Sequence, residues 1–371
     1  MNNKKVSKVL LTFVSLFSLI IGAILGAGIH YYYNRPTSDS IISGDLKIHF
    51  LELGNNNSGD SILIQIGEYD ILVDAGSKTS SLNTIRNYID SNISDNTLEY
   101  VIVTHAHEDH YANFAGNDET SLFSYYKTEN IIQFAKTNQT GKMYQNYVSM
   151  VEKEKQDGAN VYTALECYNN EKGCSRNIDL GFGVELEILN SYYYTNDAEG
   201  ENNYSICFMI NQGDNHFLFT GDLEEKGEEY LVELNNLPEV TLYKAGHHGS
   251  KTSSSETLLN VIKPKIVVIT CVAGSVEYTQ NLDNTFPTSI VLKNIAKYTD
   301  KVYVTTMGTI EHNGEKYIDT GYTSLNGDIV VNSNKNGISV TGSNNNKILK
   351  ETDWYKDYYQ NYRDNVLPWV N

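Results

Sequence analysis

The sequence predicts an α/β domain that follows one N-terminal membrane segment. Three observations lead to this class: an uncharged apolar run near the N-terminus, strand-like stretches that alternate with helical ones, and an apolar strand that runs straight into a cluster of histidines. At 371 residues, the chain is long enough for one large α/β unit with a well-buried core, plus appendages.

Residues 1–33 are predicted to be a membrane anchor. Lys4, Lys5 and Lys8 precede the run LLTFVSLFSLIIGAILGAGI at 10–29, and a bilayer-spanning helix needs about 20 such apolar residues. The lysines before the run, and their scarcity just after it, place the N-terminus in the cytoplasm. No small-x-small cleavage site ends the run, so we expect a single-pass protein of the cell membrane with an extracytoplasmic domain. A cleaved signal peptide, and hence a secreted protein, is the alternative.

Residues 34–45 form a polar linker, and the folded domain is predicted over 46–345. It begins with three successive strands, continues with a helix for which Ser81 is a candidate N-cap, and then has a buried strand that ends at the histidines. An insertion is predicted at about 111–178, and residues 346–371 form an aromatic, charged tail. The predicted strands lie at 45–54, 61–67, 69–76, 98–104, 184–190, 205–211, 216–222, 240–246, 265–272, 301–305, 327–333 and 337–343, and the predicted helices at 81–93, 142–156, 225–234, 255–262 and 287–299.

Charge and cysteine content argue against two classes of protein. With a formal net charge of −18, the surface repels phosphate backbones on average, which disfavours broad, sequence-independent nucleic-acid binding. Four cysteines fit neither a disulfide scaffold nor a cysteine-rich metal site. Cys167 and Cys174 flank a polar turn and either form a small disulfide outside the cell or stay as two loop thiols. Cys207 and Cys271 lie in apolar runs and are expected to be buried.

The segment THAHEDH at 104–110 carries the strongest chemical signal. In an extended segment, side chains two residues apart point the same way, so His105 and His107 can bind one ion together. Asp109 and His110 follow at the turn into the next element and would point to a second ion. Imidazole and carboxylate are the ligands of catalytic zinc sites that keep one coordination position open for water.

Together with FTGD at 219–222 and GHHGSKTSS at 246–254, this segment resembles the metallo-β-lactamase fold. The opening GDSILIQIG and ILVDAG stretches are similar to one branch of that fold, which contains the ComEC-type DNA-uptake channels and the phosphorylcholine esterases of teichoic acids. The resemblance covers roughly residues 46–343. It implies an αββα sandwich of two mixed sheets with outer helices.

The resemblance also implies the roles of individual residues. His105 and His107 match ligands of a first metal, and Asp109, which we also expect to be catalytic, matches a ligand of a second metal together with His110. Two zinc ions are expected, with manganese or iron as alternatives. The remaining matches are Asp222, which bridges both ions, His248, the last ligand of the second ion, His247, which orients the substrate or the attacking water, and Asp74, which hydrogen-bonds behind the histidine ligands.

Two departures from the family pattern are visible. Many members give the first metal a third histidine, but between His110 and Asp222 this chain has only His216, which is expected to be structural. At the expected place it has ENNYS, so Asn202 or Asn203 stands there and the first site is expected to be weaker or completed by water. Relatives often carry a His-Pro pair near the end of the domain, whereas here Phe286 precedes Pro287.

These observations lead to one main functional hypothesis. We expect a membrane-anchored, extracytoplasmic phosphoesterase or phosphodiesterase that uses a hydroxide held by a dinuclear metal site. Its substrate would contain a phosphoester, as in a cell-envelope polymer, with Lys244 and Lys251 beside HHGS as candidate phosphate contacts. The alternatives are a surface nuclease of the ComEC type and a degenerate, non-catalytic metal-binding module.

Overall fold

The computed structural model describes residues 44–275, 284–313, 316–362 and 368–369. The anchor predicted at 1–33 and nearly all of the linker lie outside the described residues. Among the residues that are described, no helix combines the length and the apolar character needed to cross a bilayer.

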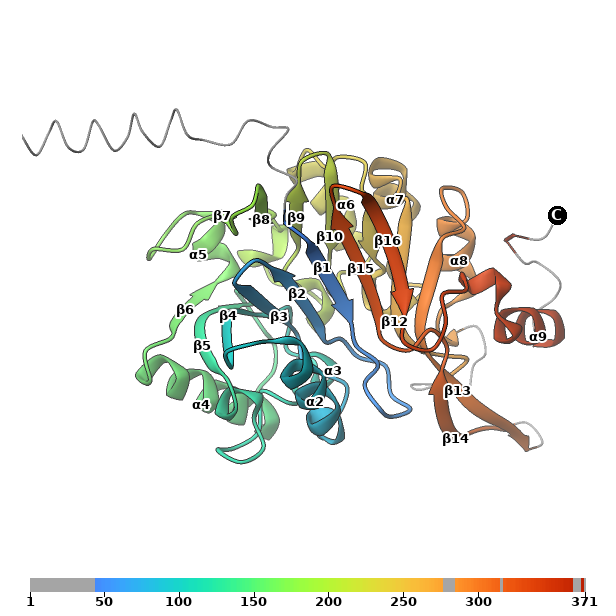
Figure 1. Ribbon diagram of the computed structural model, residues 1–371, viewed down its shortest axis with the longest axis horizontal. Helices are drawn as coiled ribbons and strands as arrows, with labels where there is room; N and C mark the ends of the chain where they lie inside the picture. The colour runs from blue at the N-terminus through green and yellow to red at the C-terminus, as the bar shows by residue number, and fades with distance from the viewer. Residues whose placement is uncertain (1–43, 276–283, 314–315, 363–367, 370–371) are drawn as a thin grey trace, which may run out of the picture. The chain divides into compact units, whose positions relative to one another are not determined.

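Two mixed sheets of eight strands each form the centre of the described domain (Figure 1). In the first sheet, β3, β4, β5 and β6 run parallel, while β1, β2, β15 and β16 pair in antiparallel fashion. Its order is β16 (Gly337–Gly342), β15 (Ile329–Asn334), β1 (Leu46–Phe50), β2 (Ile62–Ile66), β3 (Tyr69–Val73), β4 (Thr97–Val103), β5 (Lys127–Gln133) and β6 (Asn160–Thr163). The second has the order β14 (Lys316–Ser324), β13 (Val302–Asn313), β12 (Ile266–Ala273), β11 (Leu242–Lys244), β10 (Asn215–Phe219), β9 (Phe208–Gln212), β8 (Val184–Ile188) and β7 (Asn177–Asp179).

The sheets face each other across an apolar core, and helices cover their outer faces. Phe50 of the first sheet stacks on Phe219 of the second, which stacks on Phe208 with 4.6 Å between ring centroids. Figure 1 shows α2, α3 and α4 beside the first sheet and α6, α7 and α8 beside the second. The helices are α2 (Leu82–Asn92), α3 (Glu108–Tyr111), α4 (Lys142–Gln156), α5 (Ala164–Tyr168), α6 (Glu225–Leu234), α7 (Glu256–Ile262), α8 (Ser289–Ile295) and α9 (Asp353–Tyr362). This arrangement confirms the predicted αββα sandwich.

Local sequence explains the central strands. Every residue of β12 is buried, because β12 pairs in parallel with β11 and β13 and is covered on both faces. By contrast, β15 alternates buried and half-buried residues, as expected for a strand covered mainly on one face. Apolar runs therefore mark the centre of each sheet, and alternation marks its flank.

Several segments differ from the sequence-based description. The segment 111–178 contains β5 and β6, which extend the first sheet. Of the two states left open for Cys167 and Cys174, the structure has the disulfide. Ser81 precedes α2, but its hydroxyl accepts a hydrogen bond from Asn55 instead of capping the helix. The tail forms α9, whose Tyr355 is buried and packs against Trp369.

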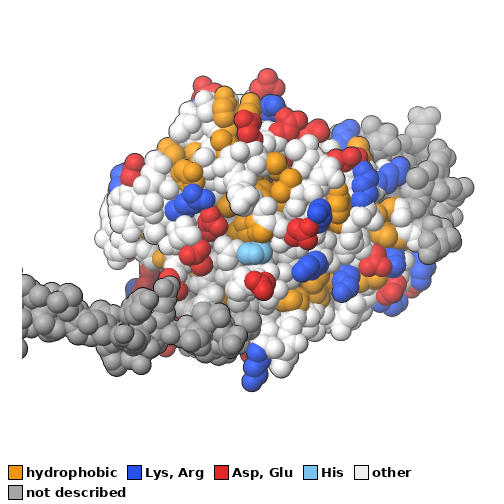
Figure 2. Space-filling model, turned by 90° about the horizontal axis from the view of Figure 1, so that it is seen from above, with side chains coloured by type: hydrophobic (Ala, Val, Ile, Leu, Met, Phe, Trp, Pro, Cys, Tyr) orange, Lys and Arg blue, Asp and Glu red, His pale blue; other side chains and the backbone are white. Residues whose placement is uncertain are grey.

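On the face shown in Figure 2, acidic and basic side chains are interspersed, so the net negative charge does not form a single acidic patch there.

Candidate metal centre

The histidine-rich segments of the two sheets meet at one edge of the sandwich. His105 and His107 follow the end of β4, and His110 lies in the single turn of α3. Asp222 follows β10, and the 3₁₀ turn Gly246–Gly249 follows β11. The carboxyl ends of strands are where α/β folds place ligand-binding groups. The two sheets together therefore build one site from segments more than a hundred residues apart.

Backbone geometry in two loops allows the close approach of these segments. His247 and His248 both adopt left-handed φ values, 47° and 52°, which are uncommon outside glycine. Gly76 passes so close to the ligand segment that a Cβ atom there would lie 1.6 Å from the carbonyl oxygen of Asp109. Only glycine fits at this position.

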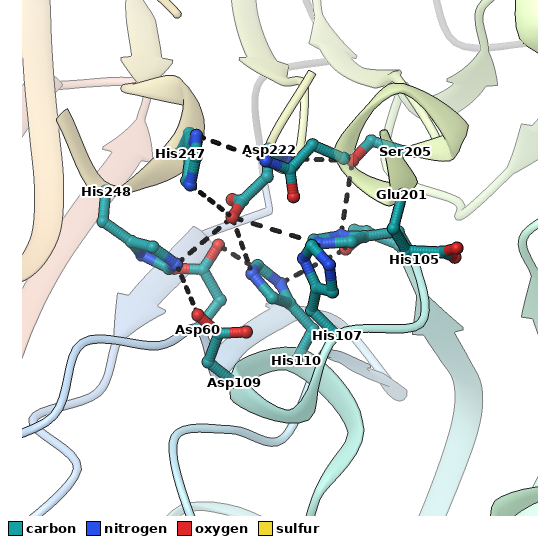
Figure 3. A network of polar contacts seen from close by, with 12 residues as sticks. Asp60, His105, His107, Asp109, His110, Glu201, Ser205, Asp222, His247 and His248 are labelled. Atoms are coloured by element: carbon teal, nitrogen blue, oxygen red, sulfur yellow. Dashed lines mark hydrogen bonds and ion pairs between the residues drawn. The ribbon is translucent and has the colours of Figure 1, made fainter. Parts of the chain in front are cut away.

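One carboxylate oxygen is the point of convergence of the site (Figure 3). The Oδ2 atom of Asp222 lies 3.1 Å from Nε2 of His110 and 3.4 Å from Nε2 of His248. It lies 3.9 Å from Nε2 of His247 and 4.0 Å from Nε2 of His105. Four imidazoles thus aim the same ring nitrogen at a single buried oxygen, which is the arrangement expected of a carboxylate that bridges two cations.

The second of the two predicted ion sites is compact. Ligand atoms of Asp109, His110, Asp222 and His248 all lie within 4.8 Å of one another. Nε2 of His110, Nε2 of His248 and both carboxylate oxygens of Asp222 are buried, and within the described part of the chain their close contacts are ion-pair contacts without a hydrogen bond of regular geometry. An unsatisfied buried polar atom costs about 1–3 kcal/mol, and a divalent cation would satisfy all four. The donor set therefore fits a divalent metal ion.

The first ion site is more open. Nε2 of His105 lies 3.1 Å from Nδ1 of His107, but within the described ranges these two histidines and Asp222 do not bring three ligand atoms within 4.8 Å of one another. His216, the remaining histidine between the two motifs, lies near the start of β10, where it makes a hydrogen bond with Asn211 of β9 outside the site. The structure therefore supplies fewer protein ligands to this ion than to the other.

Asn202 and Asn203 both bind Glu224. Nδ2 of Asn202 donates to Oε1 of Glu224 at 3.2 Å and lies 3.4 Å from Nδ1 of His247. Asn203 donates to Oε2 of Glu224 and accepts from its backbone N–H. Nδ1 of His247 also lies 3.0 Å from the hydroxyl of Thr252. The two asparagines thus lie on the His247 side of the site.

Asp74 lies directly behind a histidine ligand. Its Oδ2 atom is 2.8 Å from Nδ1 of His110 and accepts a hydrogen bond from the hydroxyl of Thr104, while its Oδ1 atom accepts from the backbone N–H of Thr104. A carboxylate in this position fixes the ring orientation and leaves Nε2 free for a metal.

Asp60 is a site residue that the sequence-based prediction missed. Its Oδ1 atom lies 3.5 Å from Nδ1 of His248 and accepts a hydrogen bond from Thr270, and its Oδ2 atom lies 3.8 Å from Nδ1 of His110. The ammonium group of Lys244 contacts Oδ2 of Asp60 and lies 3.9 Å from Oδ1 of Asp222. The family-like GDS at the start of β2 was the available signal, but an aspartate in a turn has many ordinary explanations.

The two lysines considered as phosphate contacts have different surroundings. Lys244 is only 1% exposed and lies beneath the metal ligands. Lys251 lines a cavity of about 670 Å³ together with Tyr192, Tyr230 and Glu224. Phe286 packs near both histidines of the turn, with its ring centroid 6.2 Å from that of His247.

The electrostatics of the site favour a bound cation. Burial alone would lower the pKa of His110, but the carboxylates of Asp222 and Asp74 raise it well above its usual value. Burial likewise opposes protonation of His248, yet Asp222 and Asp60 raise its pKa to about 10. Burial and the neighbouring His110 lower the pKa of His105. The buried carboxylates thus favour protonation of the His110 and His248 rings, and a bound metal ion would replace those protons.

A cavity of about 590 Å³ opens over this site. Its described lining residues are Asn57, Ser58, Lys78, His107, Glu108, Asp109 and His247. The other metal-ligand candidates, His105, His110, Asp222 and His248, are buried beneath it. A substrate can therefore reach the site from the side of His107, Asp109 and His247.

The fold and this ligand set define a protein of the metallo-β-lactamase fold with a candidate site for divalent metal ions. Residues 51–268, more than half of the chain, match the family described as "Anti-Pycsar protein Apyc1". The chain belongs to this family.

Curated relatives match over shorter stretches. "Recombination protein 2" of Haemophilus influenzae is 34% identical over 87 residues, which are 24% of this chain and 10% of that protein. "ComE operon protein 3" of Bacillus subtilis is 23% identical over 175 residues, which are 46% of this chain and 20% of that protein. The matches thus span only a tenth to a fifth of these relatives, and they confirm the predicted resemblance to the ComEC-like branch. The metallo-β-lactamase-fold protein YhfI from Bacillus subtilis superimposes with a TM-score of 0.40 at 14% identity, covering 69% of this chain and 95% of YhfI.

Proposed function

We propose that this protein is a metal-dependent phosphodiesterase. The observation that carries the proposal is the convergence of four imidazole Nε2 atoms on Oδ2 of Asp222 at the floor of an open cavity. Asp109, His110, Asp222 and His248 would hold one divalent ion, and His105, His107 and Asp222 a second, with zinc as the expected metal. Two such ions activate water at neutral pH and stabilise the charge that develops on a phosphoryl group.

His247 is proposed to contact the substrate directly. Burial lowers its pKa, so the ring is neutral at physiological pH. The Thr252 hydroxyl and the Asn202 amide both lie next to Nδ1 and can donate to it, which leaves the proton on Nε2. The His247 side chain lines the open cavity, and its Nε2 atom faces Asp222 at 3.9 Å. From there it can donate a hydrogen bond to a non-bridging oxygen of the phosphoester or to the leaving oxygen.

An extracytoplasmic location at the cell membrane is part of the proposal. The lysines before the apolar run at 10–29 support an uncleaved anchor with its N-terminus in the cytoplasm. The disulfide between Cys167 and Cys174 supports an oxidising compartment for the domain. A phosphoester of the cell envelope is the expected kind of substrate. Protease digestion of intact cells tests this location, because an outward-facing domain is cut and a cytoplasmic one is protected.

Three substrates separate the enzyme classes that share this fold. The metal-loaded protein is expected to hydrolyse bis-(p-nitrophenyl) phosphate, and to leave a lactone and a cephalosporin largely unchanged. Faster turnover of the lactone or the cephalosporin would contradict the proposal. No turnover of any of the three, in protein that holds its metal, would favour a non-catalytic metal-binding module.

A nuclease is the second candidate, because one matched relative is named for recombination. The net charge of −18 opposes it, since nucleic-acid affinity depends on cationic contacts to phosphates. Digestion of single-stranded and double-stranded DNA, with the diester assay run in parallel, distinguishes the two candidates.

A further inference from the structure

One positively charged side chain lies at the entrance of the cavity and is not among the site residues predicted from the sequence motifs. Among the described residues that line the 590 Å³ cavity, Lys78 is the one lysine or arginine. The two lysines beside the HHGS turn lie elsewhere, Lys244 beneath the ligands and Lys251 in a different cavity. An anionic substrate that enters over His107 and His247 would therefore meet Lys78 first.

The backbone of Lys78 is fixed relative to the metal-ligand segment. Its carbonyl oxygen accepts hydrogen bonds from the backbone N–H of Ser81 and from Nδ2 of Asn113. Three residues upstream, the backbone N–H of Ala75 donates to the carbonyl of His110 at 2.7 Å. The side chain of Lys78 is 42% exposed. A fixed backbone thus carries a lysine side chain that can change its partner.

The present partner of Lys78 belongs to the ligand motif itself. Its ammonium group donates to Oε2 of Glu108 at 2.8 Å, and the Glu108 side chain is 43% exposed. An exposed ion pair of this kind contributes little to stability, so Lys78 can exchange Glu108 for another partner at little cost in free energy. Glu108 also adds a second carboxylate, beside Asp109, to the lining of the cavity. Among the described residues that line the cavity, Lys78 is thus the one lysine or arginine that offsets these two carboxylates.

We propose that Lys78 binds the negatively charged group of the substrate and that Glu108 competes with the substrate for it. In the free protein, Lys78 neutralises Glu108. When an anion arrives, the ammonium group turns from Glu108 to the anion, whereas a ligand without negative charge leaves the pair of Lys78 and Glu108 in place. This inference rests on the proposed function in one respect, namely that the anion is a phosphoester.

The two members of the pair should have opposite effects when they are replaced, and this is the core of the test. Titration calorimetry with inorganic phosphate is carried out on the metal-loaded full-length protein and on Lys78→Gln and Glu108→Gln. Lys78→Gln is expected to weaken phosphate binding about tenfold and to flatten its dependence on salt. Glu108→Gln is expected to tighten binding several-fold, because it releases Lys78 and removes a like charge.

A matched control comes from Lys263, which pairs with Glu239 at the same distance of 2.8 Å on an exposed surface. Lys263→Gln should leave phosphate binding unchanged. Equal phosphate affinity in the wild type, Lys78→Gln and Glu108→Gln would overturn the inference, and so would weakening by both replacements. Phosphate binding that follows Lys78 in a protein without diester turnover would contradict the proposed phosphodiesterase and still support the anion site.

Discussion

The ammonium group of Lys244 contacts the carboxylate of Asp60 at the floor of the site, and both side chains are almost fully buried. Asp60 in turn faces Nδ1 of His110 and Nδ1 of His248. Asp60 thus lies behind both histidines that would hold the same metal ion, while the hydrogen-bond partners of their Nδ1 atoms are Asp74 and the carbonyl oxygen of Thr270. The ammonium group of Lys244 offsets one of the carboxylate charges around them.

Removal of one member of this pair should destabilise the protein strongly. Lys244→Met leaves the Asp60 carboxylate buried without its cation, and we expect the free energy of unfolding to fall by about 3–5 kcal/mol. The double replacement Asp60→Asn, Lys244→Met removes both charges and should recover a large part of that loss. Urea unfolding of the three proteins measures both effects. Additive losses in the double variant would contradict a coupled pair.

Replacement of two ligands of the second ion should abolish turnover. Asp109→Ala combined with His110→Ala removes half of the compact ligand group. We expect the loss of one metal ion per chain and a fall in diester hydrolysis of at least about a hundredfold. His216→Ala is the control, because this histidine pairs with Asn211 outside the site. Full activity of the double variant would rule out the proposed mechanism.

Thr252 should matter for turnover and not for metal binding. Its hydroxyl lies 3.0 Å from Nδ1 of His247, so Thr252→Val removes one of the groups that fix the ring tautomer. We expect kcat to fall about five- to tenfold with an unchanged metal content. Steady-state kinetics and elemental analysis on the same preparation provide the measurement. A loss of metal in this variant would instead place His247 among the ligands.

Metal binding should release protons and strengthen as the pH rises. In the metal-free protein, the raised pKa values of His110 and His248 keep both rings protonated at pH 7, and a metal binds only the neutral ring. Calorimetry in buffers of different ionisation enthalpy should therefore detect proton release on metal binding at pH 7. Binding without proton release would contradict the charge state described here.

His248 makes the stability of the metal-free protein depend on pH. The pKa of His248 is about 10 in the folded protein, whereas an ordinary histidine of the unfolded chain has a pKa of 6.5. Its protonation therefore stabilises the fold fully below pH 6.5 and less and less up to about pH 10. We expect the free energy of unfolding to fall across this window in metal-free protein. The metal-loaded protein should lack this contribution, since a metal on Nε2 keeps the ring neutral, and thermal unfolding with and without metal measures the difference.

Part of the site could be predicted from short-range sequence alone, and part could not. His105, His107, Asp109 and His110 lie within six residues of one another, so an extended segment followed by a turn already predicts two ligand pairs. The metal-ligand roles of Asp222 and His248 could be inferred only from resemblance, because neither a Gly-Asp turn nor a His-His pair shows by itself which ion it would hold. Their position depends on how the second sheet packs against the first.

Asp60 and Lys244 illustrate what local patterns miss. Asp60 precedes an ordinary apolar strand, and its partners Thr270 and Lys244 come from the other sheet. Lys244 precedes HHGS, a position that suggested a phosphate contact, but β11 is buried along its whole length. Likewise, TENIIQ of β5 is too polar to be read as a strand, although its neighbours in the sheet bury Ile131 and Ile132. Tertiary packing decides these positions.

A working dinuclear metal site is what the proposed function requires above all. The most direct test is elemental analysis of the purified full-length protein, with hydrolysis of bis-(p-nitrophenyl) phosphate followed in the same sample before chelation, after chelation and after the return of zinc. We predict about two metal ions per chain and activity that is lost and restored with them. Less than one ion per chain, or turnover that persists after complete removal of metal, would contradict the proposal.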